Sequence, residues 1–443
     1  MTRRHMMRRG PLRERQFMLL FAGRAVSSFG DMLVPIALTF AVLHLTGGSV
    51  ADLGIVLGAQ AVPLVLFVLL GGVWADRLPR QRVMLASDLI RFASQGASAV
   101  LILDGTAHIW QLAALQAIYG IADGFFTPAA NGLVPQVVSA EDLQPANALL
   151  GLSENATSIL GPAMAGVIVV VIGAGWGLAI DAVTFLVSAS FLSALRVGAG
   201  VRDAQEQATS MLTELRAGWK GFSSRRWLLV SVGYFTLMFA FGFSTFQVLG
   251  PAVAEKYLGG PGAWAAISTA MGVGSIAGGV LALRWKPAHP LRVAFAFGLF
   301  GLPIMLLLLG AHAALGLIIV TALLEGVVGS FFNAIWFTAM QKNVPEEELS
   351  RVTSWDAVGS YALHPVGLAL VGPLAATIGL PATLYGAGFI FLVITIGVVA
   401  MPSVWNFDGY DRERSSAGAG PPAAAAGATS ATPGSEVQPP GST

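Results

Sequence analysis

Two aspartates lie in the middle of long apolar segments of the chain, and each belongs to a regularly spaced set of polar or small residues. In the segment 17–45 the set is Arg24, Ser28, Asp31, Pro35 and Thr39. In the segment that begins at residue 108 the set is Gln116, Gly120, Asp123, Thr127 and Asn131. At about 100° of rotation per residue, each set falls on one narrow face of a helix. The spacing predicts two polar stripes, which either line a water-filled cavity or make a static contact between helices.

The carboxyl groups of these stripes are the first candidates for chemistry. Ionisable groups inside an apolar segment of membrane length are costly, so they are functional candidates by default. In a low-dielectric cavity two nearby carboxylates resist simultaneous ionisation, so Asp31 and Asp123 are candidates to take up a proton on one side and release it on the other. Arg24 lies two turns before Asp31 and is predicted to extend toward the nearer membrane surface rather than to pair.

A second set of candidates lies in the later part of the chain. Glu325 and Asn333 are two turns apart in the segment 313–338, and His364 in the segment 355–378 could join them. A neutral, hydrogen-bonded histidine is the alternative for His364. Glu154, near one end of the segment 147–172, is expected to be hydrated. Five aromatic residues would suit an apolar pocket or a lipid-facing surface equally: Phe125, Phe126, Phe331, Phe332 and Trp336.

The elements that must position these residues are transmembrane helices. Of the 443 residues, 55% are hydrophobic and only 11% are charged, and the mean hydropathy is +0.71. Soluble domains carry about 25% charged residues, so this chain cannot cover itself with a solvated surface. Apolar runs of about 20 residues cross a bilayer as helices. Twelve such runs are predicted, at 17–45, 52–75, 84–103, 108–130, 147–172, 176–196, 227–255, 262–283, 291–311, 313–338, 355–378 and 381–402.

Composition also argues against several classes of protein. The net charge of +1 gives no reason to expect nucleic acid as a partner. The absence of cysteine removes thiolate metal sites and cysteine nucleophiles. The six histidines form no HExxH pair, and no Walker-type loop is present, so we expect no metal, no cofactor and no direct use of ATP. An intramembrane hydrolase is disfavoured because no serine–histidine or paired-aspartate arrangement has suitable spacing.

The distribution of lysine and arginine predicts the orientation. With the N-terminus inside, twenty-two of them fall in inside loops and tails, whereas the outside loops hold only Lys256. We therefore expect both termini in the cytoplasm. The expected organisation is a basic tail (1–16), a six-helix bundle (17–196), a cytoplasmic central loop (197–226), a second six-helix bundle (227–402) and a disordered Ala/Gly/Pro/Ser-rich tail (403–443).

An internal repeat relates the two predicted bundles. GGVWADR at 71–77 is echoed by GGVLALR at 278–284, and Gly124-Phe-Phe by Ser330-Phe-Phe at nearly the same offset. A constant offset in several regions indicates duplication. Parallel repeats of this kind place a binding site between the halves, near the middle of the membrane.

The loop after the second segment carries the most specific motif. Its residues Gly72, Asp76, Arg77, Pro79 and Arg80 resemble the signature Gly-x-x-x-Asp-Arg-x-Gly-Arg of the major facilitator superfamily, with Pro79 in place of the second glycine. The resemblance implies an all-α membrane protein of twelve transmembrane helices in two pseudo-symmetric six-helix bundles. It also implies that Asp76, with Arg77 and Arg80 as partners, helps to lock the outward-facing state. A plain basic loop that only sets topology is the alternative.

The fifth segment contains Gly161-Pro162-Ala-Met-Ala-Gly166, which is similar to the Gly-Pro-x-x-Gly-Gly element of antiporters in this superfamily. Thr157 and Ala165 depart from that pattern. Proline frees a backbone carbonyl and the small residues let a neighbour approach, so a bendable contact is predicted. The resemblance implies an exporter, and an ordinary helix kink is the alternative.

The fourth segment departs from the exporters of the superfamily. Those exporters usually carry an arginine four residues before a glycine, and that arginine is tied to proton coupling. In this chain Gln116 takes the place of the arginine, four residues before Gly120. We therefore expect no fixed positive charge beside Asp123. Blocks around Asp31, Asp88 and Arg91 most resemble the branch of bacterial siderophore exporters and macrolide-efflux proteins.

Taken together, the residues and the resemblance predict a secondary transporter in the plasma membrane, monomeric and not an enzyme. It would export small amphipathic organic molecules (a drug, antibiotic or siderophore) in exchange for protons by alternating access. Its partners would be the small-molecule substrate, protons and the lipid bilayer. A uniporter or importer of a small metabolite is the alternative within the same class, and a transport-dead membrane scaffold or sensor is the alternative from another class.

Overall fold

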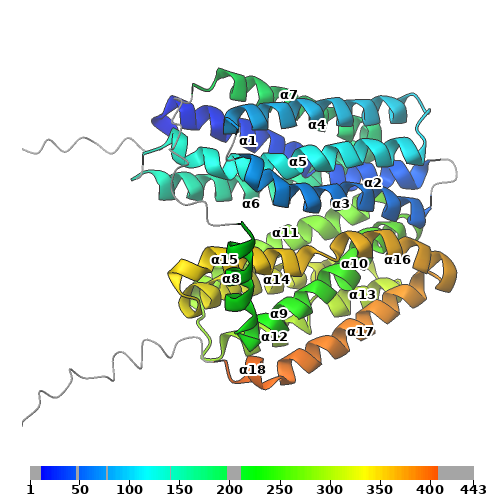
Figure 1. Cartoon of the computed structure of the whole chain (residues 1–443). Helices are drawn as coiled ribbons and strands as arrows, with labels where there is room; N and C mark the ends of the chain where they lie inside the picture. The colour runs from blue at the N-terminus through cyan, green and yellow to red at the C-terminus, as the bar shows by residue number, and fades with distance from the viewer. Residues whose placement is uncertain (1–10, 46–48, 76–77, 140, 197–210, 408–443) are drawn as a thin grey trace, which may run out of the picture.

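The computed structural model describes residues 11–45, 49–75, 78–139, 141–196 and 211–407, and every regular element in this part of the chain is a helix (Figure 1). The first group of helices, after a short 3₁₀ turn η1 (Pro11–Arg13), is α1 (Arg15–Asp31), α2 (Val34–His44), α3 (Val50–Ala75), α4 (Arg80–Leu103), α5 (Ile109–Val137), α6 (Leu143–Ile172) and α7 (Ala174–Ala194).

The second group contains two π-helical segments among its α-helices. It is α8 (Met211–Ser223), α9 (Arg226–Leu237), η2 (Met238–Phe243), α10 (Ser244–Val253), η3 (Ala254–Leu258), α11 (Pro261–Arg284), α12 (Pro290–Gly298), α13 (Leu302–Gly310), α14 (Leu315–Asn343), α15 (Glu346–Tyr361), α16 (His364–Ile378), α17 (Leu380–Ala400) and α18 (Pro402–Trp405).

All twelve predicted segments are helical, which confirms the predicted fold class. Ten continuous or nearly continuous helices in the described residues are long and apolar enough to cross a membrane. The other two predicted segments are α4 and α5. Helix α4 is less apolar because it carries Asp88 and Arg91 in its middle.

Three of the predicted segments are broken in the middle, and each break precedes a proline. Pro35, Pro303 and Pro365 are each the second residue of the helix that follows, in α2, α13 and α16. Proline has no amide hydrogen and its ring collides with the preceding turn, so the first turn of a helix accommodates it best. The breaks place the ends of short helices inside the membrane-length segments.

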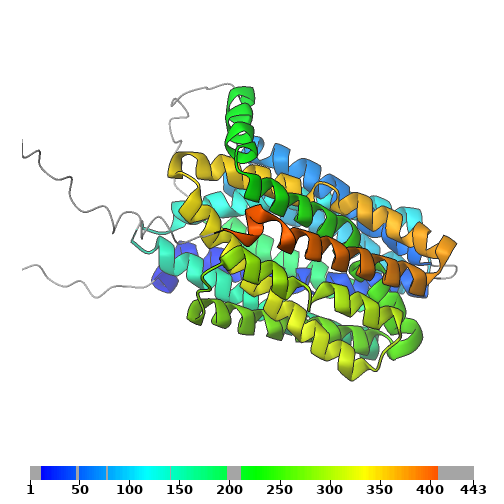
Figure 2. The same cartoon turned by 90° about the horizontal axis from the view of Figure 1, so that it is seen from below.

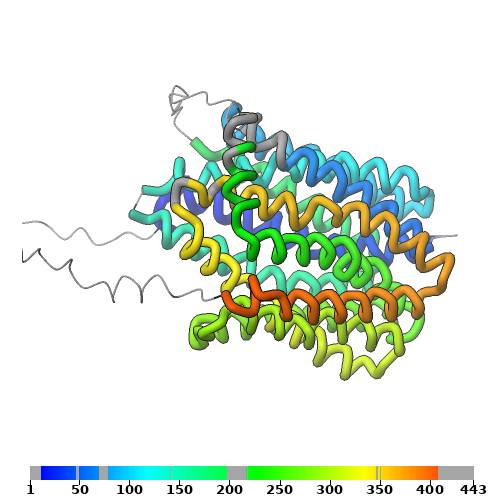
Figure 3. The backbone as a smooth tube through the Cα atoms, turned by 60° about the horizontal axis from the view of Figure 1, so that its bottom comes forward, coloured from blue at the N-terminus to red at the C-terminus, as the bar shows by residue number. Residues whose placement is uncertain are grey.

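The two groups of helices lie side by side, as Figures 1 and 3 show, and meet along α3 with α16 and along α6 with α11. Glycines allow the backbones to approach closely there. A Cβ atom on Gly54 would lie 2.6 Å from the carbonyl oxygen of Leu368, and one on Gly372 would lie 2.5 Å from that of Val50. These contacts, like the His44–Glu255 contact of 2.9 Å, lie at the end of the bundle away from the described termini.

The predicted central loop contains a helix, α8, that packs against α15 (Figure 2). The rings of Trp219 and Trp355 meet edge to face with centroids 5.0 Å apart. Arg225, which follows α8, pairs with Glu348 at 2.9 Å. Part of the polar loop is therefore a helix, and one face of this helix is aromatic.

The seventh segment changes from α to π geometry at η2, directly beside α16. A Cβ atom on Gly367 would collide with the carbonyl oxygen of Ala240, so α16 can approach η2 only through a glycine. Ser244 donates hydrogen bonds to the carbonyl oxygens of Phe239 (2.8 Å) and His364 (3.3 Å). Short π-helical segments occur mostly at functional sites.

Candidate functional site

A cavity of about 1190 Å³ lies between the two groups of helices. The first group contributes residues of α1, α2, α3, α5 and α6, and the second contributes residues of η2 and of every α-helix from α9 to α17. Ligand cavities usually measure about 300–1000 Å³, so this one has room for a drug-sized molecule. Its position agrees with the site predicted from the internal repeat.

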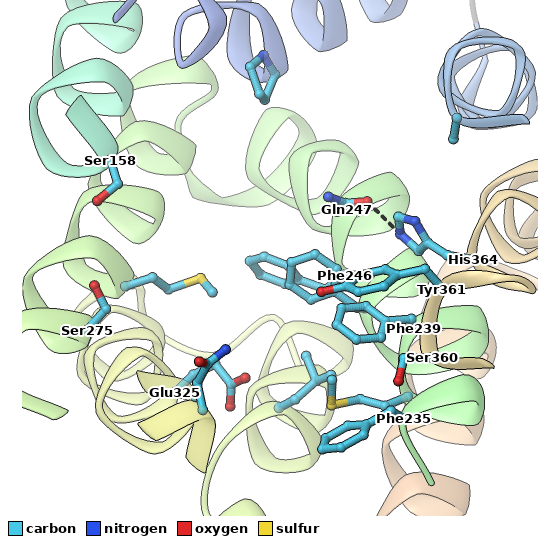
Figure 4. Close-up of a pocket in the computed structure, with 18 of the residues that line it drawn as sticks. Ser158, Phe235, Phe239, Phe246, Gln247, Ser275, Glu325, Ser360, Tyr361 and His364 are labelled. Carbon is cyan, nitrogen blue, oxygen red and sulfur yellow. Dashed lines mark hydrogen bonds between the residues drawn. The ribbon is translucent and has the colours of Figure 1, made fainter. Parts of the chain in front are cut away.

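Aromatic side chains form much of the wall that the second group contributes. Phe239 and Tyr361 stack with ring centroids 4.3 Å apart, and Phe239 also meets the ring of His364 at 5.9 Å (Figure 4). Phe235 packs edge to face on Phe332 at 5.1 Å. These rings give the cavity an apolar, polarisable wall.

Of the five aromatic residues singled out in the sequence, two line the cavity, namely Phe332 and Trp336. Phe331 is buried and stacks on Trp285 instead, with centroids 5.5 Å apart. Phe125 and Phe126 pack within the first group of helices.

Four of the residues predicted for coupling or substrate binding face this cavity. Asp31 comes from the first group of helices, and Glu325, Asn333 and His364 from the second. His364 shares a hydrogen bond of 3.2 Å with Gln247, as expected for a neutral histidine (Figure 4). Among the described residues that line the cavity there is no lysine or arginine.

Behind Asp31, a buried arginine joins three carboxyl groups, and we call this set (Arg91, Asp88, Asp123 and Asp31) the Arg91 network. The guanidinium lies 2.5 Å from Asp88, 3.2 Å from Asp123 and 3.8 Å from Asp31. Arg91 is 1% exposed, whereas the side chains of Asp31 and Asp123 are 27% and 26% exposed. The network therefore extends from the protein interior to the wall of the cavity.

Aromatic and phenolic groups hold the Arg91 network in place. The guanidinium of Arg91 lies over the ring of Phe126 at 4.1 Å and over that of Phe185 at 4.3 Å. The hydroxyl of Tyr119 donates a hydrogen bond of 2.6 Å to Asp31. A cation between two aromatic faces is stabilised without any contact with water.

The expectation that no fixed positive charge lies beside Asp123 is wrong. Arg91 supplies that charge from α4 rather than from α5, so the fourth segment alone could not reveal it. Gln116 is fully buried and donates a hydrogen bond of 3.1 Å to Gln95, away from the cavity. Its amide joins α5 to α4.

The expectation that Arg24 extends toward the surface without a partner is also wrong. Its guanidinium pairs with Glu154 at 3.0 Å, because α1 and α6 pack side by side. Neither residue lines the cavity. The pair joins two helices of the first group.

Three buried acids, Asp88, Asp181 and Asp356, were overlooked as site residues, and Asp356 lines the cavity and accepts a hydrogen bond of 3.1 Å from Nε1 of Trp336. Asp181 on α7 is fully buried, and its two carboxylate oxygens have no hydrogen-bond partner among the described residues. It lies close to Gly30, where an added Cβ atom would come within 2.5 Å of its Oδ1 atom. The rule that an acid inside an apolar segment is a functional candidate would have found it, and would equally have singled out Asp88 with Arg91.

The residues of the predicted cytoplasmic lock are only partly described. Asp76 and Arg77 lie outside the described residues, and Gly72 lies near the end of α3. Arg80 begins α4 and donates a hydrogen bond of 2.5 Å to the carbonyl oxygen of Gly132 on α5. Arg80 thus joins α4 to α5, and its part in the cytoplasmic lock stays a prediction.

The antiporter-like element of the fifth segment lies where α6 meets its neighbours. Pro162 lines the cavity. Gly161 packs under Met32, which lies at the α1–α2 break, and Gly166 packs against Ala265 of α11. The small residues therefore provide contact within the first group at one point and between the two groups at another.

The described residues contain no group of three or more His, Cys, Asp or Glu side chains that could hold a metal ion. What the site can do is enclose an amphipathic molecule between two groups of helices, with carboxyl groups on both sides. The Arg91 network places two further carboxyl groups and a guanidinium behind that space.

The comparisons with known proteins agree with this arrangement. The family model described as Major Facilitator Superfamily matches residues 20–367. The chain is 25% identical over 411 residues to the multidrug efflux pump Tap of Mycolicibacterium fortuitum, covering 90% of this chain and 98% of the relative. It is 22% identical over 385 residues to macrolide efflux protein A of Streptococcus pyogenes, covering 86% and 94%. In structure it resembles the nucleoside transporter NupG, with a TM-score of 0.67, 14% identity and coverage of 87% and 98%.

Proposed function

The chain belongs to the major facilitator superfamily, and we propose that it is an exporter of small amphipathic organic molecules that is driven by protons and works by alternating access. Its relatives and its family are transporters rather than enzymes. Two of the relatives are named as efflux proteins, one for macrolides and one for multiple drugs. The observation that carries the proposal is the aromatic cavity of about 1190 Å³ with carboxyl groups on both sides.

The wall of the cavity supports an amphipathic cargo. Rings such as those of Phe239 and Phe243 can pack on the apolar part of a molecule without demanding one shape. A few amide and hydroxyl groups, among them Gln60, Gln247 and Ser275, can hydrogen-bond its polar part. Few directional contacts and a large apolar wall favour a broad range of related molecules.

The contacts between the two groups of helices support alternating access. Among the described residues, the glycine contacts of α3 with α16 and the His44–Glu255 pair all lie at the end away from the termini. With the termini in the cytoplasm, as the basic residues predict, that end faces outward. The cavity would then be closed outside, ready to receive its cargo from the inside.

The Arg91 network supports proton coupling. One guanidinium faces three carboxyl groups, so the set is negatively charged when all of them are ionised. A net charge in a low-dielectric interior is costly, and protonation of Asp31 or Asp123 removes part of it. Because Asp31 also lines the cavity, a change in its charge directly changes its electrostatic interaction with the cargo.

The proposal is tested by replacing the two aspartates in protein reconstituted into liposomes. Asp31→Asn and Asp123→Asn should each abolish transport driven by a pH gradient, and at least one variant should still bind the cargo. Asp104→Asn, an acid at the end of α4 that does not line the cavity, is the control and should behave like the unmodified protein. If the double aspartate variant still concentrates cargo against a gradient, coupling does not reside in the Arg91 network.

A further inference from the structure

The carboxyl group of Glu325 occupies a fixed position on the second side of the cavity. It projects from the middle of α14 toward the α12–α13 break. A Cβ atom on Gly301, the residue before α13, would lie 2.0 Å from its Oε2 atom, so a side chain at position 301 would push the carboxyl group aside. The backbone amide of Leu302, the first residue of α13, faces the carboxyl group.

This placement explains how a carboxylate is tolerated there. The free amides and the dipole of a helix N-terminus stabilise a negative charge. A cation in the cavity would add to that stabilisation from the opposite side of the carboxylate.

Glu325 differs from the acids of the Arg91 network in having no cationic partner. Asp31 and Asp123 share the guanidinium of Arg91. No ion pair with Glu325 occurs among the described residues, and no lysine or arginine of the described chain lines the cavity around it. No described residue supplies a positive charge here, which leaves the site open to a positive charge of the cargo.

The surroundings of Glu325 suit an organic cation. Tyr234, Phe332 and Trp336 belong to the same region of the cavity wall, and Phe235 packs between the rings of Phe332 and Trp336 at 5.1 and 5.4 Å. Figure 4 shows Glu325 beside the space toward which Phe239, Phe246 and Tyr361 also turn. Aromatic faces attract cations, and the attraction grows when water is excluded.

We propose that Glu325 is the binding site for a positively charged group of the cargo, and that the cargo of this transporter is an amphipathic organic monocation. The inference rests on the proposed export function and adds the substrate class and its anchor. It also assigns proton binding and cargo binding to different halves of the molecule. The Arg91 network handles the proton, and Glu325 with its aromatic neighbours handles the charge of the cargo.

A pair of matched probes tests the inference. Tetraphenylphosphonium is a permanent cation that cannot lose a proton, and triphenylphosphine oxide is a neutral molecule of similar shape. Binding of each is measured with the purified full-length protein. Glu325→Gln should weaken tetraphenylphosphonium binding by about tenfold or more, which corresponds to about 1.4 kcal/mol, and should leave triphenylphosphine oxide within about twofold, an effect too small to indicate a lost contact.

Two further variants show whether the position of the charge matters. Glu325→Asp keeps the charge and should retain a preference for the cation. Gly301→Ala leaves every charged residue in place but pushes the carboxyl group aside, so it should weaken cation binding selectively. Asp104→Asn again serves as the control, and thermal unfolding of each variant shows that it is folded.

The outcomes separate this inference from the proposed function. If the unmodified protein binds and moves neither probe, the proposed export of amphipathic molecules fails. If it handles both probes and Glu325→Gln weakens both equally, the cation site is wrong while the export function stands. If Glu325→Gln instead abolishes pH-driven movement of the neutral probe and spares cation binding, Glu325 carries the proton and the division of tasks is overturned.

Discussion

At the scale of single residues, Arg91 holds the first group of helices together around its charge. It is 1% exposed and contacts acids from three helices, α1, α4 and α5. A buried charge is tolerated only when it is paired, and removing one partner leaves the others unpaired. The network therefore joins three helices, and a change in the ionisation of one acid changes the charge balance of the whole set.

We predict that Arg91→Gln destabilises the protein and abolishes pH-driven transport. Loss of one partner from a buried ion pair costs about 3–5 kcal/mol, so the unfolding temperature in detergent should fall clearly. Arg24→Gln is the matched control, because the Arg24–Glu154 pair is partly exposed and lies outside the cavity. A stable, fully coupled Arg91→Gln variant would contradict the role given to the network.

The sequence predicted Asp31 and Asp123 as site residues but not their contact with Arg91, and the reason is physical. Asp31 and Asp123 stand out because each lies on a polar stripe of its own helix, which is a local pattern. That Arg91 lies between them is a tertiary fact, because the three residues come from three helices whose relative rotation no single segment records. The same holds for Arg24 and Glu154, which are 130 positions apart.

At the scale of helices, prolines have two different effects in this molecule. Pro35, Pro303 and Pro365 each follow a break, whereas Pro162 and Pro373 lie inside continuous helices. The breaks were not predicted, because a proline inside an apolar segment is compatible with either outcome. Packing of neighbouring helices decides whether the freed backbone groups are satisfied locally. The segments themselves were predictable, since twenty apolar residues leave few alternatives.

The contact between α3 and α16 leads to a prediction about conformation. A Cβ atom on Gly372 would lie 2.5 Å from the carbonyl oxygen of Val50 and 2.6 Å from the Cα atom of Ala51, both of them backbone atoms that cannot move aside. Gly372→Val should therefore separate the helices at the end away from the termini.

The chain contains no cysteine, so a single introduced thiol reports this separation without background. In the Gly372→Val variant, a Thr39→Cys thiol in the cavity should react several-fold faster with a membrane-impermeant maleimide added from the side away from the termini. Such an increase corresponds to about 1 kcal/mol on the opening equilibrium. Gly386→Val, where nothing lies within 4 Å, is the control. Equal labelling rates in the two variants would show that this contact does not hold the end closed.

At the scale of the whole molecule, the two groups of helices are separate bodies joined at one end. The core clusters of the described residues include one that continues across the junction and others that stay within a single group. The sequence indicated this organisation through its internal repeat, and the family resemblance agreed with it. Which end is closed was not predictable, because both conformations of an alternating-access transporter use the same residues.

The His44–Glu255 pair provides a test of movement between the two bodies. His44 ends α2 and Glu255 lies in η3, with Nε2 and Oε1 2.9 Å apart. We predict that a short bifunctional methanethiosulfonate joins the two thiols of a His44→Cys/Glu255→Cys variant, that transport then stops, and that a reductant restores it. Each single cysteine variant should transport normally after the same treatment. Full transport by the crosslinked protein would exclude a separation of the two bodies at this end.

The π-helical segment η2 gives the seventh helix a property that a straight helix would lack. A π turn holds one more residue than an α turn, and each residue of an α-helix advances the chain by about 100° and 1.5 Å. Winding η2 back into α geometry would therefore turn everything beyond it by about a quarter of a revolution relative to α9. That rotation would carry Gln247 away from His364, its present partner at 3.2 Å, and would exchange the side chains that α10 presents to the cavity. A change of winding at η2 would thus change which side chains of the seventh helix line the cavity.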